Sequence, residues 1–487
     1  DRNGLRPARF QIDNDNIISI ASETGIKPTQ EENITFKGRV APGGIIAINT
    51  KTGEIYSEKQ IDEKLKNKAP YREWLKESSL YVESSLDKYE GPGLKTINSR
   101  EYSISSKLFL LFKEERTSVI KPLSIDSQEG TGSMGDDTAL AVMSKMHRQI
   151  YDYFRQQFAQ VTNPPIDSLR EVSVMSLETC YGPELNVFDE TPEHAKRLVT
   201  TSPVLSHKKL QSIVKNPYFK SDEIYLEYSK KTNLKNAIKS LNKKIVQSVK
   251  EGNTIIHLVE TLPNIEFLPI NALVAVGSVH QHLVSLGLRS KVNIVISSSS
   301  ARDTHQIACL IGFGATAVYP TLAYQTILDL TERNELKGDA HENCSRYRKG
   351  INKGLLKIIS KMGISTISSY RGSQLFAIVG LSEEVVNTCF TNTVSRIQGK
   401  SFDDLDREIR KLDEYARSNL SDISVGGLLK YVHGGEYHTY NPEIVKKLQE
   451  AVSTGSKQTY NEYASLVDNR PPAMLRDLLS VKNLNKK

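Results

Sequence analysis

An alternation of apolar runs with helical patterns in the middle of the chain constrains the fold more than any other feature. Short runs rich in Val and Ile are typical of buried strands, and longer segments with helical patterns separate them. Strands that alternate with helices build a parallel sheet with crossover helices. We therefore predict an α/β fold, either doubly wound or a degenerate barrel. The strands are expected over 254–259, 292–296 and 315–319, and the helices over 271–286 and 301–312.

The flanking segments differ in character from this middle part. The first 62 residues are typical of short strands and turns, with a hairpin turn at 50–53, and a helical, charged composition follows. Asn441 stands where it would cap a helix that begins at Pro442. Further helices are expected over 61–75, 138–155, 350–362 and 442–452, and further strands over 17–21, 44–49 and 364–368.

Bulk composition argues against several classes of protein. The 487 residues favour two or three domains. The net charge of +7 is small for this length and the lysine clusters are short, so no nucleic-acid partner is predicted. The sequence contains no run of about 18 apolar residues, so we expect no membrane span. Four widely spaced cysteines favour free thiols in a reducing cytoplasm over a disulfide framework or a metal cluster.

Two neighbouring stretches have compositions typical of residues that line a passage and do not react. Residues 130–137 (GTGSMGDD) form a glycine-rich loop, and its two aspartates are placed to cap a following helix. Residues 151–170 carry an amphipathic helical pattern that ends at Thr162-Asn163-Pro164-Pro165, where the prolines stiffen the backbone. Neither stretch pairs a nucleophile with a base or gathers metal ligands. Together they predict a wall or a passage, not a reaction centre.

Other motifs are weaker candidates for chemistry. Gly312-Phe313-Gly314 precedes a strand, whereas a dinucleotide-binding motif follows one, so we expect a tight turn there. The loop at 130–133 lacks the lysine of a phosphate-binding loop, and the adjacent aspartates would repel phosphate. The histidines are expected to be hydrogen-bonded residues of the core or surface: His257, His280, His282, His305, His433 and His438.

The cluster best placed for a ligand follows the strand over 292–296. Ser299, Ser300, Arg302 and Asp303 lie where that strand ends, and ligands of α/β folds gather at the carboxyl ends of parallel strands. Capping of the next helix by Ser300 or Asp303 is the simpler alternative.

Six long segments resemble the large (α) subunit of bacterial glutamate synthase. Two of them resemble the NAD(P)H-linked type more than the ferredoxin type, namely 300–320 and 426–443. The segments are DRNGLRPAR (1–9), GTGSMGDDTALAV (130–142), YDYFRQQFAQVTNPPIDSLRE (151–171), SARDTHQIACLIGFGATAVYP (300–320), YRKGINKGLLKIISKMGISTISSYRGSQLF (347–376) and GGLLKYVHGGEYHTYNPE (426–443).

The resemblance implies an interior fragment of a multidomain enzyme. Residues 1–70 would be the end of the glutamine amidotransferase domain, 71–435 the central domain and 436–487 the start of an FMN-binding (βα)8 synthase domain. The enzyme makes two glutamates from glutamine and 2-oxoglutarate, and its FMN and 3Fe-4S cluster would be held mainly by residues outside this chain. The implied partners are the rest of the large subunit and a small (β) NAD(P)H-oxidising flavoprotein subunit.

The same resemblance implies roles for five residues. Met134 would lie near the flavin, while Gly132, Ser133, Thr162 and Asn163 would line the ammonia tunnel or a contact between domains. No catalytic or metal-binding residue is expected in this chain, and the fragment alone is expected to be inactive.

Two other functions stay open at this point. One is a free-standing, non-catalytic α/β scaffold derived from the family, and the other is a small-molecule enzyme that uses residues 299–303. The absence of an initiator Met favours the fragment, and a ligand that saturates the isolated chain would favour the small-molecule enzyme.

Overall fold

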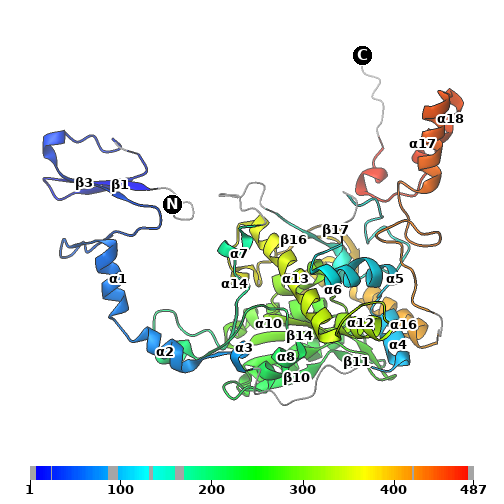
Figure 1. The fold of residues 1–487 in the computed structure, drawn as a ribbon, viewed down its shortest axis with the longest axis horizontal. Coiled ribbons are helices and arrows are strands. Elements are labelled where there is room, and N and C mark those ends of the chain that lie inside the picture. Colours follow the sequence, from blue (N-terminus) through cyan, green and yellow to red (C-terminus); the bar gives the residue numbers. More distant parts are fainter. Residues whose placement is uncertain are drawn as a thin grey trace. The chain divides into compact units, whose positions relative to one another are not determined.

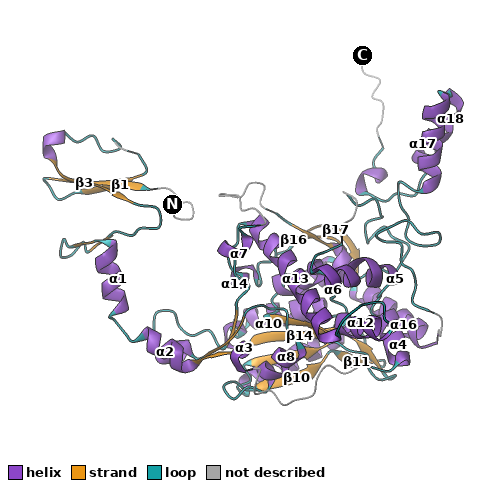
Figure 2. Ribbon diagram, viewed as in Figure 1, coloured by secondary structure: helices purple, strands orange, loops and turns teal. Residues whose placement is uncertain are grey.

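The computed structural model describes residues 7–23, 25–85, 97–130, 135–158, 169–418 and 422–480. The chain divides into two compact units. The smaller comprises Asp1–Ser79 with Thr191–Ala195, and the larger comprises Leu80–Glu190 with Lys196–Lys487. Figure 1 traces the elements of each unit along the chain, and Figure 2 separates helices from strands.

The smaller unit consists of short antiparallel strands and two helices. β1 (Ala8–Asp13) pairs with β2 (Ile18–Ala21) on one side and with β3 (Ile34–Val40) on the other. The turn predicted at 50–53 closes a second hairpin, in which Gly53 supplies a φ of 76°. The helix predicted over 61–75 is two helices, because Pro70 interrupts the pattern. The remaining elements are β4 (Ala47–Ile48), β5 (Ile55–Tyr56), α1 (Glu58–Lys66) and α2 (Tyr71–Ser78).

A parallel four-stranded sheet forms the centre of the larger unit, which confirms the predicted α/β class. Its strands follow the order β10-β12-β14-β15, and all three pairings are parallel. The sequence predicted three of these strands to within about two residues, because a strand that is buried on both faces is a continuous apolar run. The strands are β10 (Ser221–Tyr225), β12 (Ile255–Val259), β14 (Asn293–Ser298) and β15 (Ala317–Pro320).

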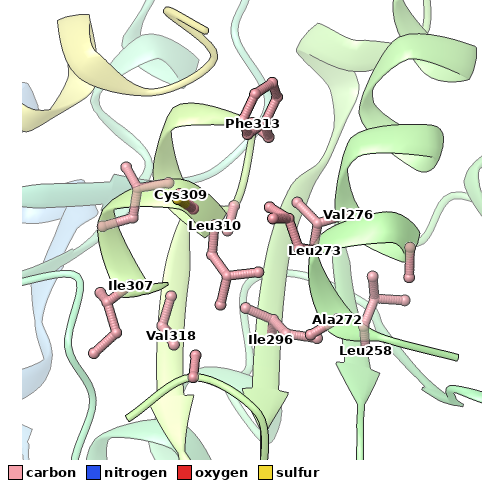
Figure 3. Close-up of a cluster of buried hydrophobic side chains, with 14 of the residues drawn as sticks. Leu258, Ala272, Leu273, Val276, Ile296, Ile307, Cys309, Leu310, Phe313 and Val318 are labelled. Atoms are coloured by element: carbon pink, nitrogen blue, oxygen red, sulfur yellow. The ribbon is translucent and has the colours of Figure 1, made fainter. Parts of the chain in front are cut away.

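Two predicted helices cover one face of this sheet. They are α10 (Ala272–Ser285) and α11 (Thr304–Gly312). Figure 3 shows Leu258 and Ile296 of the sheet in one cluster with Leu273 of α10 and Leu310 of α11, and all four are fully buried. Each such side chain contributes about 1.5–3 kcal/mol through burial of apolar surface. This packing fixes both ends of the strands, so it sets where side chains beyond each strand end come to lie.

A smaller sheet overturns one expectation. The helix predicted over 138–155 is wrong, because this segment forms a 3-10 turn at Ile150–Tyr153 and then β7 (Phe154–Gln156). β7 pairs antiparallel with β16 (Phe376–Leu381), which pairs in parallel with β17 (Val394–Lys400). Backbone groups of this segment form hydrogen bonds with distant residues instead of with one another. For example, the Leu140 N–H donates to the Ala473 carbonyl at 3.0 Å.

The two predicted capping aspartates have other partners. Asp136 accepts hydrogen bonds from the backbone and hydroxyl of Thr138, and Asp137 pairs with His438 at 2.8 Å. Residues 364–368 also differ from the prediction, because α14 (Ile367–Tyr370) stands where a strand was expected.

The remaining helices bear out most of the sequence pattern. The helix predicted over 350–362 begins ten residues earlier and ends at Gly363, whose φ is 70°. Asn441 caps its helix as predicted and accepts from the N–H groups of Glu443 and Ile444. These helices include α4 (Ser99–Leu108), α9 (Leu234–Lys250), α12 (Thr321–Glu332), α13 (Ala340–Met362), α15 (Glu383–Cys389), α16 (Phe402–Ser418), α17 (Pro442–Thr454) and α18 (Lys457–Asp468).

Candidate functional site

A buried carboxylate stands at the carboxyl edge of the parallel sheet. Glu260 follows β12 directly and is fully buried. Its oxygens accept from the N–H groups of Ala272 and Ser300, both at 2.8 Å, and from the hydroxyls of Ser298 and Ser300. Ala272 is the first residue of α10, so the positive end of that helix dipole also favours the negative charge. Neutral donors and a helix end thus hold this carboxylate.

Tyr151 extends the network from a distant part of the chain. Its hydroxyl lies 3.0 Å from Ser300 Oγ, and the whole side chain is buried. Burial and the negative charge of Glu260 raise the pKa of Tyr151 well above its usual value. The phenol therefore stays protonated and serves as a hydrogen-bond donor or acceptor rather than as a base.

Arg302 and Glu115 form a buried ion pair at the same edge. Glu115 accepts from Nε and Nη2 of Arg302, at 2.6 and 2.9 Å, which is the forked geometry typical of strong pairs. Other Arg302 N–H groups donate to the carbonyls of Phe109, Leu110 and Ser299. Burial opposes the charge of Arg302, but Glu115 outweighs it and the pKa of Arg302 is raised. This arginine cross-links three segments and has no hydrogen left over for a ligand.

Asp303 begins α11 and confirms the capping alternative for this residue. Its carboxylate accepts from the N–H of Gln306 at 2.7 Å, and the Gln306 side chain accepts in return from the N–H of Asp303. This reciprocal pair is a capping box. Burial raises the pKa of Asp303 to about 6, while the nearby His305 opposes that rise.

A cavity of about 100 Å³ borders this network. Apolar side chains form most of its wall, including Leu108 of α4, Val274 of α10 and Leu405 of α16. Its polar lining includes Glu260, Asn271 and Ser300. The hydroxyls of Ser298 and Ser300 donate to the Glu260 carboxylate, and that of Ser299 donates to the Glu260 carbonyl. The arrangement can hold a fixed backbone geometry at the strand ends.

A serine and a histidine do meet elsewhere in the sheet. His257 Nε2 lies 2.8 Å from Ser297 Oγ, and His257 Nδ1 lies 3.1 Å from a carboxylate oxygen of Glu223. These residues stand on β14, β12 and β10, and both His257 and Ser297 are buried. Neither lines the cavity at the strand ends, so the contact links three strands. The prediction of a hydrogen-bonded core histidine at 257 is confirmed.

Family models match most of the chain. The model for the glutamate synthase central domain matches residues 105–382, and the model for class-II glutamine amidotransferases matches residues 1–74. The chain is 37% identical to ferredoxin-dependent glutamate synthase 1 of Arabidopsis thaliana and 33% identical to the large chain of the NADPH glutamate synthase of Bacillus subtilis. Each alignment covers 99% of this chain and 31% of the relative.

The chain belongs to the glutamate synthase family. The resemblance seen in the sequence is therefore confirmed, and the chain spans about a third of the length of these curated relatives. Among solved structures, the flavin-binding domain of baker's yeast flavocytochrome b2 aligns with 42% of this chain and with 44% of its own chain, at 13% identity and a TM-score of 0.25. That likeness is too low to support an argument.

The glutamate synthase residues that the sequence singled out fall into two groups. Ser299, Ser300, Arg302 and Asp303 do come together, with Glu260, Glu115 and Tyr151 as partners that the sequence did not reveal. Only Glu260 carried a signal, because it directly follows a predicted strand. The second group lies outside the described residues: Gly132, Ser133, Met134, Thr162 and Asn163.

The described part of this glutamate synthase chain contains neither a metal-binding cluster nor a membrane-spanning helix. No group of three or more His, Cys, Asp or Glu there could hold a metal ion. No helix there is long and apolar enough to cross a membrane.

Proposed function

We propose that this chain is part of a glutamate synthase, which converts L-glutamine and 2-oxoglutarate, with a reductant, into two molecules of L-glutamate. Within that enzyme the chain connects the glutaminase site with the synthase site and helps wall the passage for ammonia. It performs no chemistry alone. The observation that carries the proposal is the central-domain match over 105–382. A hollow adds support, because residues that adjoin both predicted segments in the sequence line it.

That hollow has a volume of about 860 Å³. Polar and basic side chains line it, among them Gln156, His305, Lys357 and Lys361. Glu129 and Phe158 line it too. In the sequence, Glu129 directly precedes the predicted loop 130–137, and Phe158 stands shortly before the predicted segment Thr162-Asn163-Pro164-Pro165. This supports a joint role for Gly132, Ser133, Thr162 and Asn163 in the passage, with Met134 on the flavin side.

A closed passage suits ammonia for a chemical reason. Sealed sites keep reactive species away from bulk water and so prevent side reactions. In water at neutral pH ammonia would take up a proton and lose its nucleophilic lone pair. A wall without reactive groups fits this task, and the strand-end network of Glu260, Ser300 and Tyr151 is likewise saturated with internal hydrogen bonds.

Cofactors and partners follow from the family. Cys309, Cys344 and Cys389 are buried and Cys180 is exposed, and the described residues gather no ligand set, so they do not fit an iron–sulfur cluster. We therefore assign FMN and the 3Fe-4S cluster to other parts of the enzyme. NAD(P)H as the electron source, delivered by a small flavoprotein subunit, and a cytoplasmic location complete the proposal.

The test uses the full-length enzyme with Asn163→Leu, which replaces a polar group by an apolar one of similar size. We expect glutamine hydrolysis to continue while glutamate formation falls, so that free ammonia appears in solution. Asn236→Leu is the matched control, because Asn236 is exposed on α9 far along the chain from both segments. Unchanged coupling in Asn163→Leu would contradict the role of this residue.

The size of the native polypeptide tests the broader proposal. The chain has a mass of 54.5 kDa. An antibody against it should detect, in denatured extracts of the source cells, a band roughly three times larger. A band near the mass of the chain itself would favour the free-standing scaffold instead.

A further inference from the structure

Three arginines gather at the amino edge of the parallel sheet, opposite to the edge that holds Glu260. Arg289 lies between α10 and β14, Arg197 begins β9 (Arg197–Thr200) and Arg371 follows α14. All three belong to the larger unit and are partly buried. Their positions follow from backbone contacts that bring three distant segments together.

The first contact joins Arg197 to the start of β14. β9 pairs antiparallel with β8 (Thr179–Tyr181), which places Arg197 beside Gly182. A Cβ atom on Gly182 would lie 2.7 Å from Nη1 of Arg197, so the guanidinium lies against this backbone. Gly182 in turn exchanges two hydrogen bonds of 3.0 Å with the side chain of Asn293, the first residue of β14.

The second contact joins Arg289 to Arg371 through His280. Nε of Arg289 donates to Nδ1 of His280 at 3.0 Å. Gly372, which follows Arg371, packs on the same ring, because a Cβ atom there would lie 3.1 Å from Cε1 of His280. Arg289 and the backbone that follows Arg371 thus contact the same imidazole ring.

These three arginines lack the acidic partners that other buried arginines have. Arg289 donates to His280 and to the backbone carbonyls of Val292 and Gly314. Arg197 has one weak bond, to the Lys196 carbonyl at 3.4 Å. Among the described residues, the side chain of Arg371 has no hydrogen-bond or ion-pair partner, and no carboxylate lies within ion-pair distance of the three guanidinium groups.

The positive charges of the three arginines repel one another. Burial lowers the pKa of Arg289 to about 10, and the positive charge of Arg371 adds to that effect. Burial also lowers the pKa of Arg197 and of Arg371, and Glu184 is the carboxylate whose charge favours all three. Cations that are crowded together and short of a counter-charge are costly, and an incoming anion offsets that cost.

We propose that a small oxyanion, a carboxylate or a phosphate, binds between Arg197 and Arg371. The planar guanidinium presents paired N–H donors that match two oxygens of such a group. Arg289 stays on the backbone carbonyls and contributes its charge, while Arg197 and Arg371 provide the donors. None of the three arginines belongs to the hydrogen-bond network around Glu260.

Cys180 provides a reporter inside the cluster. Its thiol is the exposed one of the four cysteines, and the other three are buried. Burial and Glu178 raise the pKa of Cys180, while the charges of Arg197 and Arg371 lower it. A bound anion would neutralise that positive field and reduce the thiolate fraction, which is the reactive form.

The first experiment titrates the purified 487-residue chain by calorimetry with inorganic phosphate and, separately, with glutarate, at constant ionic strength. We expect one anion to bind in a saturable 1:1 manner, and the stronger of the two identifies the ligand class. Arg371→Gln and Arg197→Gln should each weaken binding at least tenfold, which is typical for loss of one charge-assisted pair. Arg396→Gln, at an exposed arginine of β17, should bind as the wild type does.

The second experiment follows alkylation of Cys180 by iodoacetamide, a neutral reagent, with mass spectrometry of the labelled peptide. The bound anion should slow the reaction in the wild type but not in Arg371→Gln. Lack of reaction at Cys309, Cys344 and Cys389 shows that each variant is folded. The proposal is wrong if neither anion saturates the wild-type chain, or if Arg396→Gln weakens binding as much as Arg371→Gln does.

Discussion

The two edges of one parallel sheet differ in whether their charged side chains have partners within the fold. At the carboxyl edge Arg302 is paired with Glu115, and Glu260 accepts hydrogen bonds from four neutral donors, two N–H groups and two hydroxyls. At the amino edge Arg197 and Arg371 have no carboxylate in contact among the described residues. A charge that is matched inside the fold serves stability, whereas an unmatched one is available to something outside it. Whether the charges at a strand end are paired therefore says more about function than the position of a residue at that strand end.

The largest expected effect is at Arg302. Arg302→Met should lower the free energy of unfolding by about 3–5 kcal/mol, because it leaves the Glu115 carboxylate buried without its partner and frees three carbonyls. Urea unfolding followed by circular dichroism measures this loss. Arg333→Met is the matched control, since Arg333 forms a surface pair with Asp329 and its side chain is 56% exposed. A surface pair contributes about 0–1 kcal/mol. Equal losses in the two variants would mean that the carboxyl edge is not specially held.

The next effect concerns Glu260. Glu260→Gln keeps the shape of the side chain but turns one acceptor oxygen into an N–H2 donor that faces other donors. We expect a loss of about 2–3 kcal/mol in the same unfolding experiment, typical for a buried group left unsatisfied. Glu266→Gln, at an exposed position before β13 (Phe267–Pro269), should change stability by less than about 0.5 kcal/mol. A stabilised Glu260→Gln protein would show instead that the negative charge is a burden, and that the cavity beside it awaits a cation.

The sequence predicts a structural element well when the interactions that form it are local, and poorly when they involve distant residues. β12, β14 and β15 were predicted because each is a continuous apolar run, and the cap at Asn441 because a cap acts within three residues. The helix predicted over 138–155 is wrong because its backbone finds partners some 300 residues away, such as Thr138 with His438. Distant contacts of this kind override local pattern.

The candidate site divides in the same manner. Ser300 and Arg302 could be found because they follow a predicted strand, but Glu115 and Tyr151 arrive from more than 140 residues earlier in the chain. The cluster at the amino edge gave no sequence signal, since Arg197, Arg289 and Arg371 are far apart along the chain. Only the fold shows that they share one place and lack acidic partners.

His280 links stability at the amino edge to pH. Burial lowers its pKa from 6.5 to about 4, and the positive charge of Arg289 adds to this. The folded state therefore keeps His280 neutral, while the unfolded chain takes up a proton as the pH falls below 6.5. The contribution to stability is full above pH 6.5 and is lost as the pH falls toward 4, by about 1.4 kcal/mol per pH unit. His280→Asn retains an acceptor for Arg289 and should remove this dependence.

The difference between wild type and His280→Asn, measured by urea unfolding at pH 7, 6 and 5, isolates this group from Asp303. That separation matters because the raised pKa of Asp303 acts in the opposite direction, stabilising the fold as the pH falls. Parallel stability profiles for the two proteins would show that His280 is accessible to protons in the folded state.

The smallest effect is expected at Arg371, where the amino edge departs most from the carboxyl edge. Arg371→Gln removes a partly buried cation that has no partner among the described residues, so it breaks no ion pair and relieves repulsion with Arg289. Its free energy of unfolding should lie within about 0.5 kcal/mol of the wild type in an anion-free buffer. In saturating phosphate or glutarate the wild type should gain stability by mass action, whereas the variant should not. A loss of several kcal/mol without any anion would mean that Arg371 is bound within the fold as Arg302 is, and the contrast between the two edges would then fail.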